Sequence, residues 1–312
     1  MDVGVSLPTV GPIGEREFLL DIAHAADRAG LHSVWATDHV ILPKHRTSEY
    51  PYKRSTTEVL FSEGVEWLDP VAVMGVVAGA TERVAIGTSI LVLPYRSPVV
   101  LANELSTLDK LSEGRIILGV GIGWMTEEFD ALGVPASERG ARTDEYIRAM
   151  KALWSSNGFV SFDGRFVRFN DMSLAAHPHR QGGPPVYVGG NSPAALRRAG
   201  ALADGWLGME IFVEEVAEAR TALEKATADA GREPRSVMLS VRRGLVPPFE
   251  VANFLPERRS ITGTARDVAD ELLRYRDEGV ALASLDLAML PAEAVRAIEW
   301  LSAEVLSLLS VE

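Results

Sequence analysis

The residues best suited to chemistry follow short apolar runs that are predicted to be strands. Asp38 and His39 come directly after one such run, Ser33–Thr37. A carboxylate beside an imidazole can contact the heteroatoms of a cofactor ring or exchange a proton. The same two residues could instead be structural, with Asp38 capping a turn and His39 hydrogen-bonded in the core. The pattern alone leaves both interpretations open.

A glycine-rich stretch follows another apolar run, at 115–118. Glycine alternates with Val and Ile over Gly119–Gly123, Trp124 comes next, and Thr126–Glu128 has the capping hydroxyl and acidic residues of a helix start. A dinucleotide-binding G-x-G-x-x-G motif would need glycine at position 124. The alternation suits either a flat ligand close to the backbone or a barrel interior filled by small residues. The stretch predicts a pocket but does not indicate which cofactor would bind there.

A third candidate site opens a helix. Gly189 and Gly190 follow the run Pro185–Val188, and Asn191-Ser192 leads into Pro193. Backbone amides at a helix N-terminus bind phosphate readily, and Pro suits the first helical turn. An ordinary helix cap explains the same residues equally well.

The composition of the 312-residue chain limits the kinds of partner and binding site that we expect. Its net charge is −12 and it has no long basic run, so nucleic acid is not expected. Without cysteine it has no disulfides, thiolate metal ligands or cysteine nucleophiles. The six histidines form no close ligand cluster, so no metal site is predicted. The start resembles no signal peptide and no long apolar span occurs, so we expect a cytoplasmic protein outside the membrane.

The elements around these residues alternate between strand and helix. The predicted strands are Val3–Leu7, Ser33–Thr37, Val84–Leu93, Ile116–Gly121, Pro185–Val188, Gly205–Gly208, Val237–Val241 and Leu282–Leu287. The predicted helices are Glu15–Ala29, Pro70–Ala80, Pro98–Leu111, Thr126–Leu132, Arg139–Trp154, Pro193–Leu202, Glu214–Ala230, Thr264–Asp277 and Ala292–Leu309. Eight strand-and-helix units predict an α/β fold, a (β/α)₈ barrel forming one domain over 1–312.

Three segments fall outside this alternation. A long polar loop, 42–67, follows the second strand, and its length is typical of a lid over an active site. Its aromatic residues are Tyr50, Tyr52, Phe61 and Trp67. A small hairpin, Val160–Phe162 with Phe166–Phe169, precedes the fifth strand, and an irregular segment covers Pro247–Ile261.

Five stretches together resemble the luciferase-like monooxygenase superfamily, within it the oxidoreductases that depend on the deazaflavin coenzyme F420. They are TDHVILP at 37–43, VAIGTSILVLPYRSP at 84–98, LDKLSEGRIILGVGIGWMTEEFDALGV at 108–134, PPVYVGGNSPAALRRAGALADGW at 184–206 and ITGTARDVADELLRY at 261–275. They cover nearly the whole chain in order. Several motifs at matching strand ends are more specific than any one of them.

The resemblance implies a flavin or deazaflavin ring at the carboxyl ends of the barrel strands, with Ser89–Ile90 as a non-prolyl cis peptide behind it. It implies catalytic roles for His39 and Asp38, with His39 as the candidate for proton transfer. It also implies a cofactor-binding set comprising Asp38, Ser89, Ile90, Leu91, Gly121, Trp124, Glu127, Gly189, Gly190, Asn191 and Ser192.

One position departs from the family pattern. Sugar-phosphate dehydrogenases of this family have an acidic glutamate where this chain has Trp124, so we do not expect a sugar phosphate as substrate. The leading hypothesis is hydride transfer between F420 and an unidentified small organic substrate. The alternatives are an FMN-dependent monooxygenase that uses dioxygen, and a non-catalytic flavin- or deazaflavin-binding protein.

Basic residues stand out in an acidic chain. Lys44, His45, Arg46, Lys53 and Arg54 cluster in the long loop, and His177, His179 and Arg180 precede the fifth strand. If both groups lie at the active face, they could steer an anionic coenzyme, although a solvated loop has the same composition. The family often forms homodimers, but no sequence feature here establishes an interface.

Overall fold

The computed structural model describes residues 1–11, 14–52, 61, 64–251, 260–287 and 289–309. The predictions made for Lys53 and Arg54 lie outside these residues, as does the centre of the segment 247–261.

Within the described residues, eight parallel strands close into a barrel, which confirms the predicted (β/α)₈ fold. The ring runs β10-β12-β1-β2-β3-β5-β8-β9, and pairing of β9 with β10 closes it. Its strands are β1 (Asp2–Ser6), β2 (Ser33–Ala36), β3 (Ala85–Thr88), β5 (Ile116–Gly121), β8 (Val186–Gly189), β9 (Gly205–Met209), β10 (Met238–Val246) and β12 (Leu282–Asp286).

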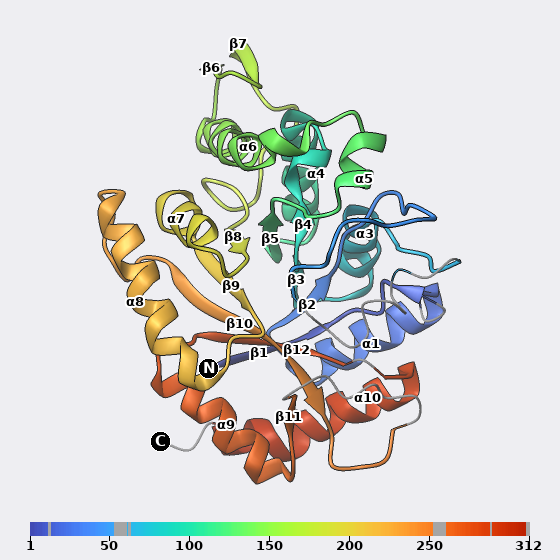
Figure 1. The fold of residues 1–312 in the computed structure, drawn as a ribbon. Coiled ribbons are helices and arrows are strands. Elements are labelled where there is room, and N and C mark those ends of the chain that lie inside the picture. Colours follow the sequence, from blue (N-terminus) through green and yellow to red (C-terminus); the bar gives the residue numbers. More distant parts are fainter. Residues whose placement is uncertain (12–13, 53–60, 62–63, 252–259, 288, 310–312) are drawn as a thin grey trace.

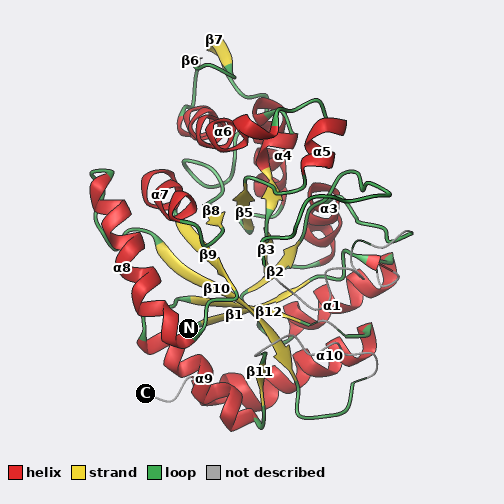
Figure 2. Ribbon diagram, viewed as in Figure 1, coloured by secondary structure: helices red, strands yellow, loops and turns green. Residues whose placement is uncertain are grey.

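Helices surround this ring of strands (Figures 1 and 2). They are α1 (Arg16–Arg28), α3 (Pro70–Ala80), α4 (Pro98–Leu111), α5 (Thr126–Ala131), α6 (Arg139–Ser155), α7 (Pro193–Leu202), α8 (Val213–Asp229), α9 (Ala265–Asp277), α10 (Pro291–Trp300) and α11 (Leu306–Leu309). Several begin where the sequence predicts. Asp69, for example, accepts hydrogen bonds from the amides of Val71 and Ala72 and so caps α3. None of the helices in the described ranges has the length and apolar character needed to cross a bilayer.

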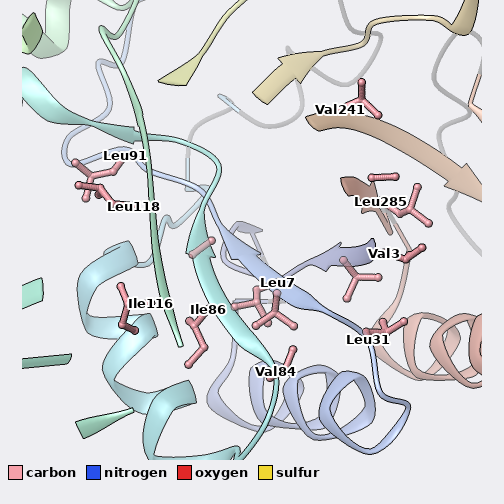
Figure 3. Close-up of a cluster of buried hydrophobic side chains, with 14 of the residues drawn as sticks. Val3, Leu7, Leu31, Val84, Ile86, Leu91, Ile116, Leu118, Val241 and Leu285 are labelled. Carbon is pink, nitrogen blue, oxygen red and sulfur yellow. The ribbon is translucent and has the colours of Figure 1, made fainter. Parts of the chain in front are cut away.

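Most of the core lies between the strands and the helices. Outward-facing side chains such as Val3, Ile86, Ile116, Val241 and Leu285 are fully or almost fully buried there (Figure 3). Inward-facing side chains fill the barrel itself. Trp35, Ile117, Tyr187 and Leu282 form a separate buried cluster, which closes the interior below the strand ends.

The predicted strand Val84–Leu93 is interrupted. Its first part, β3, pairs with β5 as far as Gly87, and a second part, β4 (Leu91–Val92), resumes opposite Val120 and Gly121. Between these two pairings, three residues of the segment lie opposite two residues of β5. The one extra residue makes a β-bulge. Periodicity in the sequence continues across the bulge and does not reveal it.

Other boundaries also differ from prediction. The hairpin is present as β6 (Val160–Asp163) and β7 (Arg168–Met172), the second strand beginning two residues later than predicted. Strand β10 continues past Val241 to Val246 and pairs there with the short β11 (Ile261–Thr262), at the end of the segment predicted to be irregular. The last predicted helix is divided into α10 and α11 by a π-helical turn at Leu301–Val305.

Candidate active site

His39 lies just beyond β2, against the first turn of α5. Its Nδ1 is 2.8 Å from Oε2 of Glu128, and both side chains are buried. Three more groups bind the same carboxylate: the amides of Val40 and Ile41 donate to Oε1 at 2.6 and 3.2 Å, and the Tyr95 hydroxyl donates to Oε2 at 3.0 Å. The strand-end loop and the start of α5 are therefore joined through one fully buried carboxylate.

The charge state of Glu128 determines which nitrogen of His39 is available. Burial alone would raise the pKa of Glu128, but the hydrogen bond and charge of His39, with the two backbone amides, lower it below its ordinary value of 4.5. An ionised carboxylate can only accept, so Nδ1 of His39 carries a proton and donates it. Nε2 is then the atom left to exchange a proton with a bound molecule.

Asp38 sits beside His39, but its carboxylate is turned toward other protein groups. Nη1 and Nη2 of Arg96 donate to its two oxygens at 2.6 and 2.8 Å, and the Val92 amide donates at 2.8 Å. Burial raises the pKa of Asp38, against the opposing effect of the Arg96 charge. Arg96 also donates to Asp69, the cap of α3, so Asp38 connects the ends of β2 and β4 to that helix.

The predicted cis peptide between Ser89 and Ile90 is confirmed. It lies in the bulge between β3 and β4, and Nη1 of Arg242 donates to the Ser89 carbonyl oxygen and to its Oγ, the latter at 3.1 Å. Arg242 in turn pairs with Asp286, with Nε and Nη2 at 2.8 and 2.7 Å from Oδ1. Both members of this ion pair are 7% exposed.

The Ile90 side chain explains the glycines on two neighbouring strands. A Cβ atom added at Gly121 would lie 2.2 Å from Cδ1 of Ile90, and one added at Gly189 would lie 2.5 Å from its Cγ2. At Gly119, a Cβ would lie 1.9 Å from the Thr88 carbonyl oxygen. Of the two interpretations left open by the sequence, the structure therefore favours close packing inside the barrel for these glycines. Leu91, next along the chain, is fully buried.

The predicted phosphate turn lies between β8 and α7. Gly190 has a φ of +110°, and a Cβ there would be 3.4 Å from the Tyr52 hydroxyl oxygen of the long loop. The Asn191 amide bonds to both the nitrogen and the carbonyl oxygen of Met209, and the Ser192 hydroxyl accepts from the Ala195 amide at the start of α7. Both side chains therefore shape the turn.

Glu127 anchors the long loop. Its Oε1 accepts from the amide and hydroxyl of Thr47 at 2.5 and 2.6 Å and from the Ser48 amide at 3.0 Å, while Oε2 accepts from the Ser48 hydroxyl at 2.7 Å. Burial raises the pKa of Glu127, but the hydrogen bonds from Thr47 and Ser48 together outweigh it and lower the pKa well below its ordinary value. Neighbouring carboxylates on α5 thus hold two parts of the loop region: Glu128 at His39 and Glu127 at Thr47.

Aromatic rings gather around His39. The centroids of Trp67, Phe61 and Trp124 lie 4.5, 5.0 and 6.0 Å from that of the imidazole, each nearly perpendicular to it. The Tyr50 ring lies 5.2 Å from Trp124, and the Arg46 guanidinium lies 5.4 Å from the Trp124 ring centre. We call Tyr50, Phe61, Trp67 and Trp124 the aromatic cluster.

One expectation about charge is wrong. His179 and Arg180 lie next to Gly114, which precedes β5, and the Arg180 amide donates to Asp109 near the end of α4. They are therefore at the amino-terminal end of the barrel, opposite the candidate site. A segment that leads into a parallel strand must lie at the end where that strand begins.

Sequence reasoning missed several residues of the site. It assigned no catalytic or binding role to Glu128 or Tyr95. Glu128 contacts His39, and Tyr95 contacts Glu128, only through tertiary packing, and their spacing in the chain carries no signal of this. Arg242 and Asp286 did leave a signal. Each is charged and lies near the carboxyl end of a predicted strand, where the barrel rule places functional residues.

Comparisons with known proteins fit this architecture. Residues 1–247 match the family described as luciferase-like monooxygenase, so the chain belongs to that family. An F420-dependent glucose-6-phosphate dehydrogenase of Amycolatopsis mediterranei (strain U-32) is 32% identical over 227 residues, which cover 69% of this chain and 62% of that protein. The match thus spans less than two thirds of that relative.

Solved structures share the fold at lower identity. An F420-dependent secondary alcohol dehydrogenase, in complex with an F420–acetone adduct, superposes with a TM-score of 0.80 at 19% identity, covering 99% of both chains. The monooxygenase RslO1 from Streptomyces bottropensis superposes with a TM-score of 0.79 at 21% identity, covering 98% of this chain and 99% of that one.

Proposed function

We propose that this protein is an oxidoreductase that binds coenzyme F420 and transfers a hydride between the deazaflavin and a small organic substrate. The observation that carries this proposal is the buried Glu128–His39 pair at the carboxyl ends of the strands. It provides an oriented proton-exchanging group at the place where β/α barrels bind ligands. Relatives named as F420-dependent support the choice of coenzyme.

The residues present fit such a coenzyme. The turn Gly189–Ser192 leads into the start of α7, where backbone amides suit a phosphate, and the φ of +110° at Gly190 favours glycine there, with the Tyr52 hydroxyl oxygen close by. This turn and the Tyr52 hydroxyl would hold a phosphate. Ile90, supported by Gly121 and Gly189, would form the apolar wall behind the ring.

In the proposed mechanism the protein orients the substrate and handles the proton. The coenzyme, when bound, supplies the hydride chemistry. Glu128 keeps the proton of His39 on Nδ1, so Nε2 exchanges a proton with the substrate oxygen or nitrogen. Asp38 acts indirectly, because its carboxylate is bound by Arg96 and by the Val92 amide. We assign it to positioning His39.

An FMN-dependent monooxygenase is the second candidate. It is favoured by the family description and by the fold shared with RslO1. The Glu128–His39 pair and the phosphate turn would serve either cofactor, so the two candidates are distinguished by which cofactor binds.

Fluorescence titration of the purified protein with F420 and, separately, with FMN tests the proposal. We expect saturable binding of F420 with clearly weaker binding of FMN. The opposite preference, together with oxygen consumption in the presence of reduced FMN, would establish the monooxygenase. If neither cofactor binds, both enzymatic proposals fail and a non-catalytic role returns.

The basic loop offers a finer test of coenzyme choice. Arg46 contacts Trp124 next to His39, so we propose that it attracts the anionic coenzyme. Arg46→Glu should weaken F420 binding strongly at low salt and little at high salt. The matched control is Arg168→Glu on the exposed hairpin strand β7, which should leave binding unchanged. Equal affinities for both variants would refute this role.

We also propose that the protein is a cytoplasmic homodimer that pairs through α3 and α4. Every residue of α3 is apolar, yet Val76 on it is 46% exposed and Val100 on α4 is 56% exposed. A helix that is apolar on all sides normally has all sides covered. Light scattering should show a dimer that Val76→Asp converts to monomer, with Phe159→Asp as the exposed control. A monomeric wild type would refute the interface.

A further inference from the structure

We infer that the substrate is an uncharged, largely apolar molecule, such as an aromatic ketone or alcohol, which binds in the aromatic cluster with its polar group at Nε2 of His39. This inference rests on the proposed function and names the substrate class of the same site. It depends on three observations: aromatic rings surround the imidazole, exposed aliphatic side chains lie next to it, and the nearby charged groups already bind other protein groups.

The rings give the imidazole an apolar surrounding. Trp67, Phe61 and Trp124 stand at 76°, 81° and 82° to the plane of His39, with centroids within 4.5–6.0 Å. Each of these three side chains is only partly buried, so apolar ring surface is accessible to a ligand. Because Glu128 binds Nδ1, a molecule bound beside these rings would meet the imidazole at Nε2.

The rim of the site is apolar as well. Val40 and Ile41, the two residues after His39, are 50% and 49% exposed, although their amides are held by Glu128. These exposed aliphatic side chains directly follow His39, and together with the partly exposed aromatic rings around His39 they give an apolar surface. Such a surface favours a hydrocarbon ligand, because its burial removes apolar area from water.

The charged groups around the cluster are already engaged by the protein. Glu128 accepts from His39, Tyr95 and two amides, and Glu127 accepts from Thr47 and Ser48. The Arg46 guanidinium lies over Phe61 and Trp124 and donates to the Ser48 carbonyl oxygen. These described charges already have protein partners, so a charged substrate would have to give up its hydration beside the rings and compete with those partners, which is unfavourable.

A matched pair of probes tests this inference without the coenzyme. Acetophenone and 4-acetylbenzoate share the ring and the ketone and differ by one carboxylate. Isothermal titration calorimetry of the full chain should show acetophenone binding more tightly by about tenfold or more, since the carboxylate of its partner must be desolvated. Equal affinities, or tighter binding of 4-acetylbenzoate, would overturn the inference.

Variants of Trp124 locate the binding. Trp124→Ala should weaken acetophenone binding by about tenfold, whereas Trp124→Phe, which keeps an aromatic ring, should stay close to wild type. Phe159→Ala, a ring removal at a side chain that is 78% exposed before β6, is the control and should change nothing. Wild-type affinity in Trp124→Ala would place the probe elsewhere and overturn the inference.

The two proposals fail in different ways. If the coenzyme proposal is wrong, F420 will not bind, but acetophenone will still bind more tightly than 4-acetylbenzoate. Failure of the substrate class would appear as normal F420 binding with no preference between the two probes.

Discussion

The imidazole Nδ1 of His39 and the Oε2 of Glu128 are 2.8 Å apart, although 89 residues separate them in the chain. The strand β2 places one and the first turn of α5 places the other, so the barrel itself builds the pair. Since the amides of Val40 and Ile41 bind the same carboxylate, Glu128 sets both the tautomer of His39 and the path of the loop that follows it.

Glu128→Gln should therefore impair catalysis through His39. A neutral amide can still accept from the loop amides, but it no longer favours the Nδ1-protonated tautomer. We expect kcat to fall by about 100-fold with little change in F420 affinity. Nitrogen NMR of the histidine should show one tautomer in wild type and a mixture in the variant. Glu127→Gln, the same change one residue earlier, is the control, and equal kcat values for the two variants would contradict this role.

Acid should weaken the fold partly through Glu128. Its pKa is lowered in the folded state, so its contribution to the free energy of unfolding is fully present above the unfolded value of 4.5 and is lost as pH falls through the folded pKa. Urea unfolding at a series of pH values should show a stability difference between wild type and Glu128→Gln that shrinks below that value. Tyr95→Phe removes only one donor and should keep most of the acid dependence. A stability difference that grows as the pH falls would show that the pKa of Glu128 is not lowered in the folded state.

Removing one member of the Arg242–Asp286 ion pair should destabilise the fold more than removing both members. Arg242→Met leaves the Asp286 carboxylate, 7% exposed, without its guanidinium partner, and we expect a loss of about 3–5 kcal/mol in the free energy of unfolding. The double variant Arg242→Met/Asp286→Leu removes both charges and should be more stable than the single variant. Chemical denaturation measures all three proteins. Additive losses would mean that the two side chains are not coupled.

Gly121 should not tolerate a methyl group. The Cβ of Gly121→Ala would lie 2.2 Å from Cδ1 of Ile90, so the Ile90 side chain, which also packs against Gly189, must shift. We expect a loss of about 1–3 kcal/mol in unfolding free energy and weaker F420 binding. At Gly158 an added Cβ meets nothing within 4 Å, so Gly158→Ala is the control. Thermal melts and F420 titration of both variants provide the measurement, and similar results for the two would remove Ile90 from the proposed ring wall.

The local sequence determined the frame of this protein. Apolar runs such as Ile116–Gly121 predict strands, capping residues such as Asp69 predict helix starts, and their regular alternation predicts the barrel. These features depend on neighbours in the chain, so a pattern reveals them. The barrel rule also directed attention to Asp38 and His39, because parallel strands bring their carboxyl ends to one face.

Tertiary structure decided what those residues contact. The orientation of Asp38 toward Arg96, the capture of His39 by Glu128 and the support of Ile90 by glycines of two strands all join elements far apart in sequence. Such contacts depend on strand register and on which side of a strand or helix turns inward. The same reason explains why His179 and Arg180 lie at the far end of the barrel: chain direction, not charge, decides on which face a loop emerges.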